Sequence, residues 1–158
     1  MGLYDSIDLN WQWFGDYAIG KDGDLADTSN DALLSLANEI QTVCAAEFDD
    51  WAMDPNVGAG LSDFVGEAND RATGKAIENR LLSRIVAIGI VRPEDMKVRV
   101  VPVGRNEIMA TITVNATATS LNNLRPGEAL TVTLLYDTVE QEVFFFEYAE
   151  SSRTARSF

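Results

Sequence analysis

The stretch DDWAMDPNVGAGLSDFVGEAND, residues 49–70, decides the fold, because it joins two segments that have the apolar spacing of helices. It combines an aromatic residue, a rigid Asp54-Pro55 pair, several glycines and several carboxylates. Proline fixes the backbone and glycine permits tight bends, so the segment has a defined shape rather than that of a solvated linker. We interpret it as an interface on the protein surface.

An amphipathic helix is predicted on each side of this stretch. Before it, apolar residues recur at three- and four-residue spacing over residues 30–48. After it, residues 73–88 have the same spacing, and Gly89 is placed to end the helix. Arg80 and Arg84 fall on the outward side of this second helix, where we expect them to offer a positive face to an acidic neighbour.

The rest of the chain has the alternation and turn residues of strands. Strands are predicted over residues 96–103, 107–119, 130–136 and 143–148, joined as two hairpins. Asp22-Gly23 predicts a further short hairpin, since both residues tolerate the positive φ of a two-residue turn. The expected fold class is α+β: two amphipathic helices packed on a small, mostly antiparallel sheet, with an N-terminal hairpin and a C-terminal hairpin extension.

One domain is expected from 158 residues of which 46% are hydrophobic. Residues 1–15 form an aromatic N-terminal arm that packs on its own domain or on a neighbour. Residues 16–149 form the α+β domain, and residues 150–158 a flexible C-terminal tail. The uncharged run from Ile108 to Leu124 alternates with the period of a strand, so no membrane partner is expected.

The charge is large, negative and unevenly placed. The net charge is −13, and 15 of the 25 acidic residues lie in residues 1–70, where Lys21 is the only basic residue. Such a field disfavours nucleic acid and anionic membranes and favours a basic protein partner or cations. Histidine is absent, which removes Ser-His-Asp and Cys-His catalysis. We expect no enzymatic activity, no catalytic residues and no cofactor.

Two isolated features have residue types found in metal sites or reactive thiol sites. Asp22, Asp24 and Asp27 resemble calcium ligands, but the glycine and terminal glutamate of an EF-hand loop are missing at their required spacing. Cys44 lies on the apolar side of the first helix, and its acidic surroundings lack the positive neighbours of a reactive thiol. No metal site is predicted, and Cys44 is interpreted as a core residue.

The carboxylates near residues 49–67 allow one enzymatic alternative, because glycosidases need only two positioned acids. No residue pattern marks one of them as desolvated and another as ionised, which the acid and base roles require. A purely structural alternative is also open. In it Asp63 or Asn69 caps a helix start, and Trp51 and Phe64 belong to the core.

In its order of motifs, the chain resembles the T-even-type baseplate wedge and sheath-initiator proteins of contractile phage tails. In that family a helix leads to an aromatic-x-x-Asp-Pro-x-x-Gly segment, here residues 51–58. A leucine-rich turn with Phe-x-Gly-Glu-Pro-Asn follows, here residues 61–69, with Ala68 where many members have proline. A second helix and a β-hairpin, here residues 98–114, complete the pattern, which covers roughly residues 16–116.

The resemblance implies a structural role in the virion. Family members are similar to the hand-shaking domain of the tail sheath subunit and are bound in the baseplate by wedge proteins. They offer a sheet edge on which the first sheath ring assembles. The implied partners are baseplate wedge proteins, the tail sheath subunit and tube or hub proteins. The implied location is the tail baseplate, after assembly in the host cytoplasm.

Two sets of residues are expected to carry this role. The wedge interface comprises Trp51, Asp54, Pro55, Gly58, Asp63, Phe64, Gly66, Glu67 and Asn69. The sheath-docking sheet edge comprises Ile108, Ala110, Ile112, Val114, Val143 and Phe145. The alternatives are a neck, tail-terminator or tube-adaptor protein and, with less support, the carboxylate-dependent glycan hydrolase.

Overall fold

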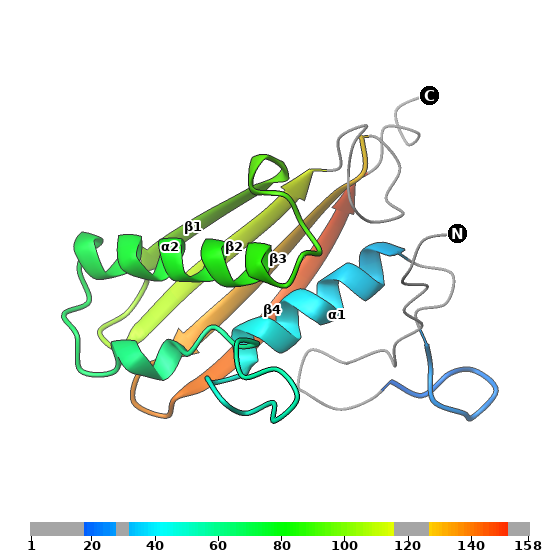
Figure 1. Cartoon of the computed structure of the whole chain (residues 1–158), viewed down its shortest axis with the longest axis horizontal. Coiled ribbons are helices and arrows are strands. Elements are labelled where there is room, and N and C mark those ends of the chain that lie inside the picture. The colour runs from blue at the N-terminus through cyan, green and yellow to red at the C-terminus, as the bar shows by residue number, and fades with distance from the viewer. Residues whose placement is uncertain (1–17, 28–31, 116–126, 152–158) are drawn as a thin grey trace.

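The computed structural model of the chain describes residues 18–27, 32–115 and 127–151, without the side chains of residues 32, 142 and 144–151. The predicted N-terminal arm and the residues after 151 lie outside this description. Figure 1 shows two helices on one face of a sheet. The elements are α1 (Ala32–Ala45), η1 (Leu61–Phe64), α2 (Arg71–Ala87), η2 (Pro93–Asp95), β1 (Met96–Pro102), β2 (Glu107–Asn115), β3 (Ala129–Asp137) and β4 (Glu142–Ser151).

The sheet is an antiparallel meander with the spatial order β1-β2-β3-β4. Its register sets Val98 against Ile112 and Ile112 against Val132, so that β-branched residues from three strands share one face. Alternation along β2 puts its buried residues on this face and half-buried ones such as Thr111 and Thr113 on the other. A β-bulge between Thr133 and Leu134 interrupts the pairing of β3 with β4.

The core lies between this face and the helices. Within this core, α1 packs on β3 and β4, whereas α2 packs on β1. Ile40 of α1, Leu81 and Ile85 of α2, and Ile112 and Leu130 of the sheet are fully buried there. The opposite face of the sheet has no helix over it among the described residues (Figure 1). The fold is therefore a two-layer α+β structure, as predicted.

The ends of α2 have clear chemical causes. The Asp70 side chain accepts hydrogen bonds from the N–H groups of Ala72 and Thr73, both at 2.9 Å, so Asp70 is the N-cap. These bonds lower the pKa of Asp70. Gly89 follows the helix with a φ of 78°, the left-handed conformation that glycine adopts without strain.

Several predicted boundaries were confirmed and others were corrected. The short N-terminal hairpin is present as a bridge between Ile19 and Leu25. The C-terminal hairpin extends the sheet, because β3 pairs with β2 and β4 follows as the next strand. β4 runs to Ser151, so the domain continues past residue 149.

The predicted sheath-docking edge is wrong for its β2 residues. Ile108, Ala110, Ile112 and Val114 lie in a strand that is paired on both sides, and their side chains are buried under the helices. An alternating pattern reports which face is buried and does not report which strand is outermost. Val143 does lie in the edge strand β4, half-buried against the core. Phe145 lies in β4 with its Cα opposite that of Leu134.

The packing predicts a large loss of stability when Ile85 is truncated. Its side chain is 0% exposed, so Ile85→Ala leaves a cavity between α2 and the sheet. We expect the free energy of unfolding to fall by about 2–5 kcal/mol, measured by urea denaturation. Val139→Ala is the control, since Val139 is 66% exposed in the β3–β4 turn. Equal midpoints for the two variants would contradict this placement of the core.

The Asp70 cap predicts a dependence of stability on pH. Because folding lowers the pKa of this carboxyl from 3.8, its contribution is present above about pH 4 and disappears as the pH falls through the lower folded value. Asp70→Ala should therefore differ most from the native chain near neutral pH, and the gap between their urea midpoints should narrow in acid. Asp70→Asn keeps a capping oxygen that does not titrate, so it serves as the control. A gap that stays constant down to pH 2.5 would be inconsistent with the cap.

Candidate interaction surface

Residues 46–70, here called the connector, carry the chain from the end of α1 to the start of α2 (Figure 1). The second half of the connector returns to the C-terminal end of α1 and forms hydrogen bonds with its last carbonyl groups. The N–H of Ala59 donates to the Val43 carbonyl at 2.8 Å, and the N–H of Gly60 donates to the Ala46 carbonyl at 3.3 Å. These donors satisfy carbonyls that a helix C-terminus leaves open.

Two glycines make this close return possible. Gly58 has a φ of 121°, and a Cβ there would lie 2.6 Å from the Glu47 carbonyl oxygen. Gly60 has a φ of 58°, and a Cβ there would collide with the Phe48 ring. Gly58 was predicted to belong to the wedge interface, but it is buried, so its role is to let the backbone pass.

A second attachment joins the connector to itself. Glu47 accepts hydrogen bonds from both the N–H of Ser62, at 3.2 Å, and the Ser62 hydroxyl, at 2.6 Å. The carboxylate is well suited to this place, because its two oxygens accept from the N–H and the hydroxyl of the same residue. Glu47 therefore fixes η1 against the end of α1.

Arg80 is the central anchor of the connector. Its Nη1 donates to the Ala59 carbonyl at 3.2 Å and to Asp63 Oδ2 at 3.0 Å. Its guanidinium lies over the rings of Phe48 and Phe64, 5.1 and 5.2 Å from their centroids. One planar cation thus joins an ion pair, a backbone carbonyl and two aromatic rings, which a lysine cannot do.

Arg84 adds a parallel contact one turn later. Its guanidinium lies 4.4 Å from the Phe48 centroid, and its Nη1 donates to the Asn56 carbonyl at 3.4 Å. Arg80 and Arg84, which were predicted to offer a positive face to an acidic neighbour, meet the connector of their own chain, where Arg80 pairs with Asp63. Both arginines leave the helix surface on the outward side but turn back onto their own connector, where their long side chains reach carbonyls and rings.

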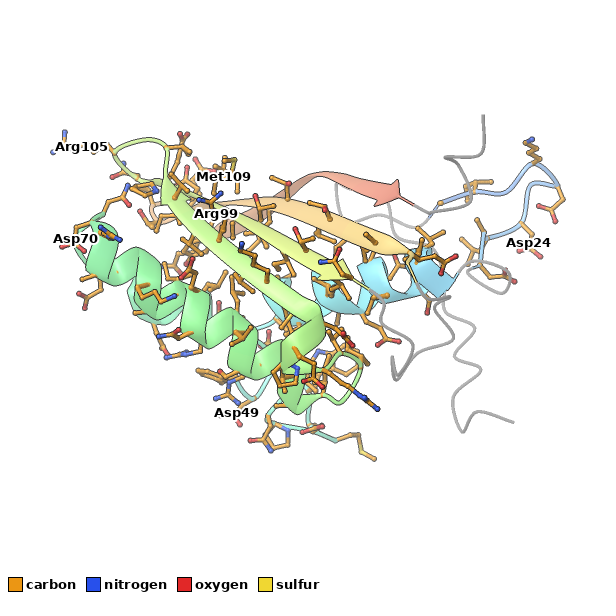
Figure 2. The ribbon with its side chains drawn as sticks, turned by 90° about the horizontal axis from the view of Figure 1, so that it is seen from above. Asp24, Asp49, Asp70, Arg99, Arg105 and Met109 are labelled. Atoms are coloured by element: carbon orange, nitrogen blue, oxygen red, sulfur yellow. The ribbon has the colours of Figure 1, made fainter. Side chains whose placement is uncertain are left out.

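Residues 49–57, here called the tip, project from these anchors. Trp51 is 49% exposed and Met53 is 97% exposed, so Trp51 is not a core residue. Asp54 organises the tip from within: its N–H donates to the Trp51 carbonyl, and its Oδ1 accepts from the N–H of Asn56, both at 3.1 Å. Figure 2 shows Asp49 at the periphery of the molecule. The tip presents two large apolar side chains beside carboxylates.

Residues 65–69, here called the shoulder, lie between η1 and α2. Gly66 has a φ of 85°, and both Gly66 and Glu67 are exposed. Asn69 does not cap a helix. Its Nδ2 donates to the Gly104 carbonyl at 2.5 Å and lies 3.5 Å from that of Glu107, which fastens the shoulder to the β1–β2 turn.

The predicted wedge-interface residues therefore fall into two kinds. Those that present surface are Trp51, Asp54 and Pro55 in the tip and Gly66 and Glu67 in the shoulder; those that hold the connector in place are Gly58, Asp63, Phe64 and Asn69. Phe64 is half-buried and packs against the core, which agrees in part with the alternative that Phe64 is a core residue. Sequence reasoning missed Glu47 and Phe48 as anchors, since their partners lie far along the chain and no local spacing links them.

The described residues contain no group of three or more His, Cys, Asp or Glu side chains placed to hold a metal ion. In the N-terminal hairpin, Asp22 and Asp24 accept hydrogen bonds from nearby backbone N–H groups. Burial raises the pKa of the Cys44 thiol to about 12, so thiolate chemistry is suppressed at this residue. Cys44 is a core residue, as predicted.

The chain was compared with known proteins at three levels. No protein-family model, no curated protein and no solved structure matches it. Within the described residues, neither helix combines the length and the apolar content of a membrane span.

The anchors predict that the connector depends on the planarity of Arg80 and not only on its charge. Arg80→Lys keeps the charge but loses the stacking on two rings, which should lower the free energy of unfolding by about 1–2 kcal/mol. Hydrogen exchange of backbone amides in residues 49–65 should also become faster. Arg71→Lys, at the exposed start of the same helix, is the matched control. Native exchange rates in Arg80→Lys would show that the arginine does not hold the connector.

Proposed function

We propose that this chain is a non-enzymatic structural subunit of the baseplate of a contractile phage tail. In this proposal it joins the baseplate wedge through the connector and helps to start the tail sheath at a free edge of its sheet. Its partners are wedge proteins and the tail sheath subunit, with tube or hub proteins as neighbours. It acts in the virion, after assembly in the host cytoplasm.

The observation that carries this proposal is the exposure of Trp51 and Met53 on a loop that is otherwise fully anchored. An exposed tryptophan costs free energy in water, and interface hot spots are enriched in tryptophan. Because Arg80, Arg84 and Glu47 already order the connector, a partner that covers the tip gives up little conformational entropy. A preformed apolar tip is what a permanent assembly contact needs.

The charge of the connector adds a preference for partners. Asp49, Asp50 and Asp54 flank the exposed Trp51, whereas the nearby Arg80 is already engaged inside the molecule. The surface of the tip is therefore acidic, and a partner with basic residues around an apolar pocket is favoured. This supports a protein partner for the connector and disfavours nucleic acid.

The sheath contact is proposed for the outer edge of β4. β4 ends the strand order, so no described strand pairs with its outer side, where a neighbouring chain's strand would be added. Backbone hydrogen bonds would supply affinity, and alternate side chains would set the register. The residues retained from the sequence prediction are Val143 and Phe145, and the buried β2 residues are excluded.

The arrangement of carboxylates also supports a role without catalysis. Asp49, Asp50, Asp54, Asp63 and Glu67 are all exposed. A glycosidase acid must stay protonated near neutral pH, which requires a desolvated carboxyl group. Asp54 and Asp63 instead accept hydrogen bonds inside the connector. Peptidoglycan hydrolysis that is lost in Asp54→Asn would count against this view.

Removing the exposed side chains from the tip and the shoulder together tests the proposal. Trp51→Ala with Glu67→Ala should leave the isolated protein folded, because both side chains are exposed and neither anchors the connector. Tails produced with this variant should lack the protein and lack sheath, as measured by mass spectrometry and electron microscopy of purified particles.

The control pair is Val139→Ala with Glu140→Ala, which removes one apolar and one acidic side chain that are also exposed, from the β3–β4 turn. It should enter tails normally. Native incorporation of the Trp51 and Glu67 variant would remove the connector from the interface. If a label on the protein appeared at the head-proximal end of the tail, the baseplate assignment would be wrong, and the neck, tail-terminator or tube-adaptor alternative would be supported.

A further inference from the structure

A groove of about 500 Å³ runs between α2 and the edge strand β1. Its helix side is formed by Lys75, Glu78, Asn79 and Leu82, and its strand side by residues 96–99. β1 is the first strand in the sheet order, so no described strand pairs with its outer side. A groove between a helix and an open strand edge has the shape that accepts an extended peptide as an added strand.

The backbone of β1 offers hydrogen-bonding groups to this groove. The N–H of Val103 donates to the Glu107 carbonyl at 3.1 Å, which fixes the phase of the antiparallel ladder. Bonding alternates along such a pair, so every second residue of β1 turns its N–H and C=O away from β2. Pro102, which has no N–H, lies opposite Ile108 in the outward-turned set. By the same phase, Val98 directs its N–H and C=O to the free edge, whereas the Val100 carbonyl faces Gly74 of α2.

The two faces of β1 differ in chemistry. Met96 is buried and Val98 half-buried on the helix side, whereas Lys97 and Arg99 are exposed on the open face of the sheet. Figure 2 labels Arg99 and Met109, which lie on this open face. Neither Lys97 nor Arg99 has an ion-pair partner among the described residues, whereas Lys75 is paired with Glu78 at 2.6 Å. The groove therefore combines three apolar side chains, Leu82, Met96 and Val98, with an unpaired positive rim in a strongly acidic protein.

We infer that this groove binds the N-terminal arm of a second copy of the chain as a fifth strand. Residues 6–13 read Ser-Ile-Asp-Leu-Asn-Trp-Gln-Trp, a strict alternation of polar and apolar side chains. When a strand is added to a sheet, residues that lie directly opposite each other on the two paired strands point to the same face. Ile7 and Leu9 then pack beside Met96, Val98 and Leu82, and Asp8 lies beside Lys97 and Arg99. Both the apolar pattern and the charge of the arm match the groove.

The position of the N-terminal hairpin favours a second copy over the same chain. The arm precedes this hairpin, and the hairpin leads into α1, which packs on β3 and β4 rather than on β1. Figure 2 shows Asp24 of the hairpin at the far right of the molecule, well away from Arg99. Binding of an arm by the next copy is a head-to-tail contact, which closes into a ring or continues as a filament. This inference is independent of the proposed function.

Charge reversal in the full-length chain tests the inference. Sedimentation velocity should show concentration-dependent association of the native chain. Asp8→Arg and Arg99→Asp should each weaken this association at least tenfold, because each places like charges side by side. Arg99 is exposed, so the circular dichroism of Arg99→Asp should be that of the native chain, and the same spectrum is expected for Asp8→Arg.

Mixing the two variants distinguishes a second copy from the same chain. The arm of the Asp8→Arg chain matches the groove of the Arg99→Asp chain, and the remaining native arm matches the remaining native groove. An equimolar mixture should therefore associate as strongly as the native chain, although neither variant does so alone. A mixture that stays monomeric, or a native chain that is monomeric at all concentrations, would overturn the inference.

The backbone contribution is tested at Val98. Val98→Pro removes a donor that faces the free edge and no bond to β2, and proline is tolerated at such edge positions. Val98→Ala is the matched control, since it loses similar packing but keeps the N–H. Association of Val98→Pro should be at least tenfold weaker than that of Val98→Ala. Equal association of the two variants would show that no strand is added to β1.

Discussion

The burial of a single sheet face under two helices is the constraint on which the other features depend. α1 covers β3 and β4, whereas α2 covers β1 on the same face of the sheet. The chain between the helices must therefore run across this face from one edge of the sheet toward the other. A crossing of this kind leaves backbone N–H and C=O groups without helix or strand partners. The connector makes this crossing, and charged side chains form hydrogen bonds with several of its backbone groups.

Arginine and glutamate supply that answer at low cost. Arg80 and Arg84 lie on adjacent turns of α2, so that the helix itself positions both guanidinium groups over the Phe48 ring. Glu47 performs the complementary task for the N–H of Ser62. Carbonyls therefore meet cations and an N–H meets a carboxylate, which gives charge-assisted hydrogen bonds in an otherwise irregular segment. The same contacts neutralise part of the acidic half of the chain.

Much of the fold could be predicted from the sequence, because apolar residues recur at three- and four-residue spacing in both helices, β1 to β3 alternate, and β4 has a continuous apolar run at residues 143–146. The strand order could not be predicted, since the alternation of Ile108, Ala110 and Ile112 is the same in an inner strand and in an edge strand. The choice of cap also lay beyond local reasoning. Asn69 and Asp70 are both competent N-caps, and the carbonyls of Gly104 and Glu107 decide between them by engaging Asn69.

The candidate site was predicted more in its location than in its mechanism. Residues 49–70 do form the connector, but the roles of its members depend on contacts with residues far along the chain, such as Asp63 with Arg80. The tip itself is held by the Asn56 carbonyl, which accepts from Arg84, and by the Asp50 carboxylate, which accepts from the N–H of Glu47 at 2.8 Å. Neither contact uses the side chain of Trp51 or Met53. These two exposed positions can therefore be exchanged by grafting without removing either contact.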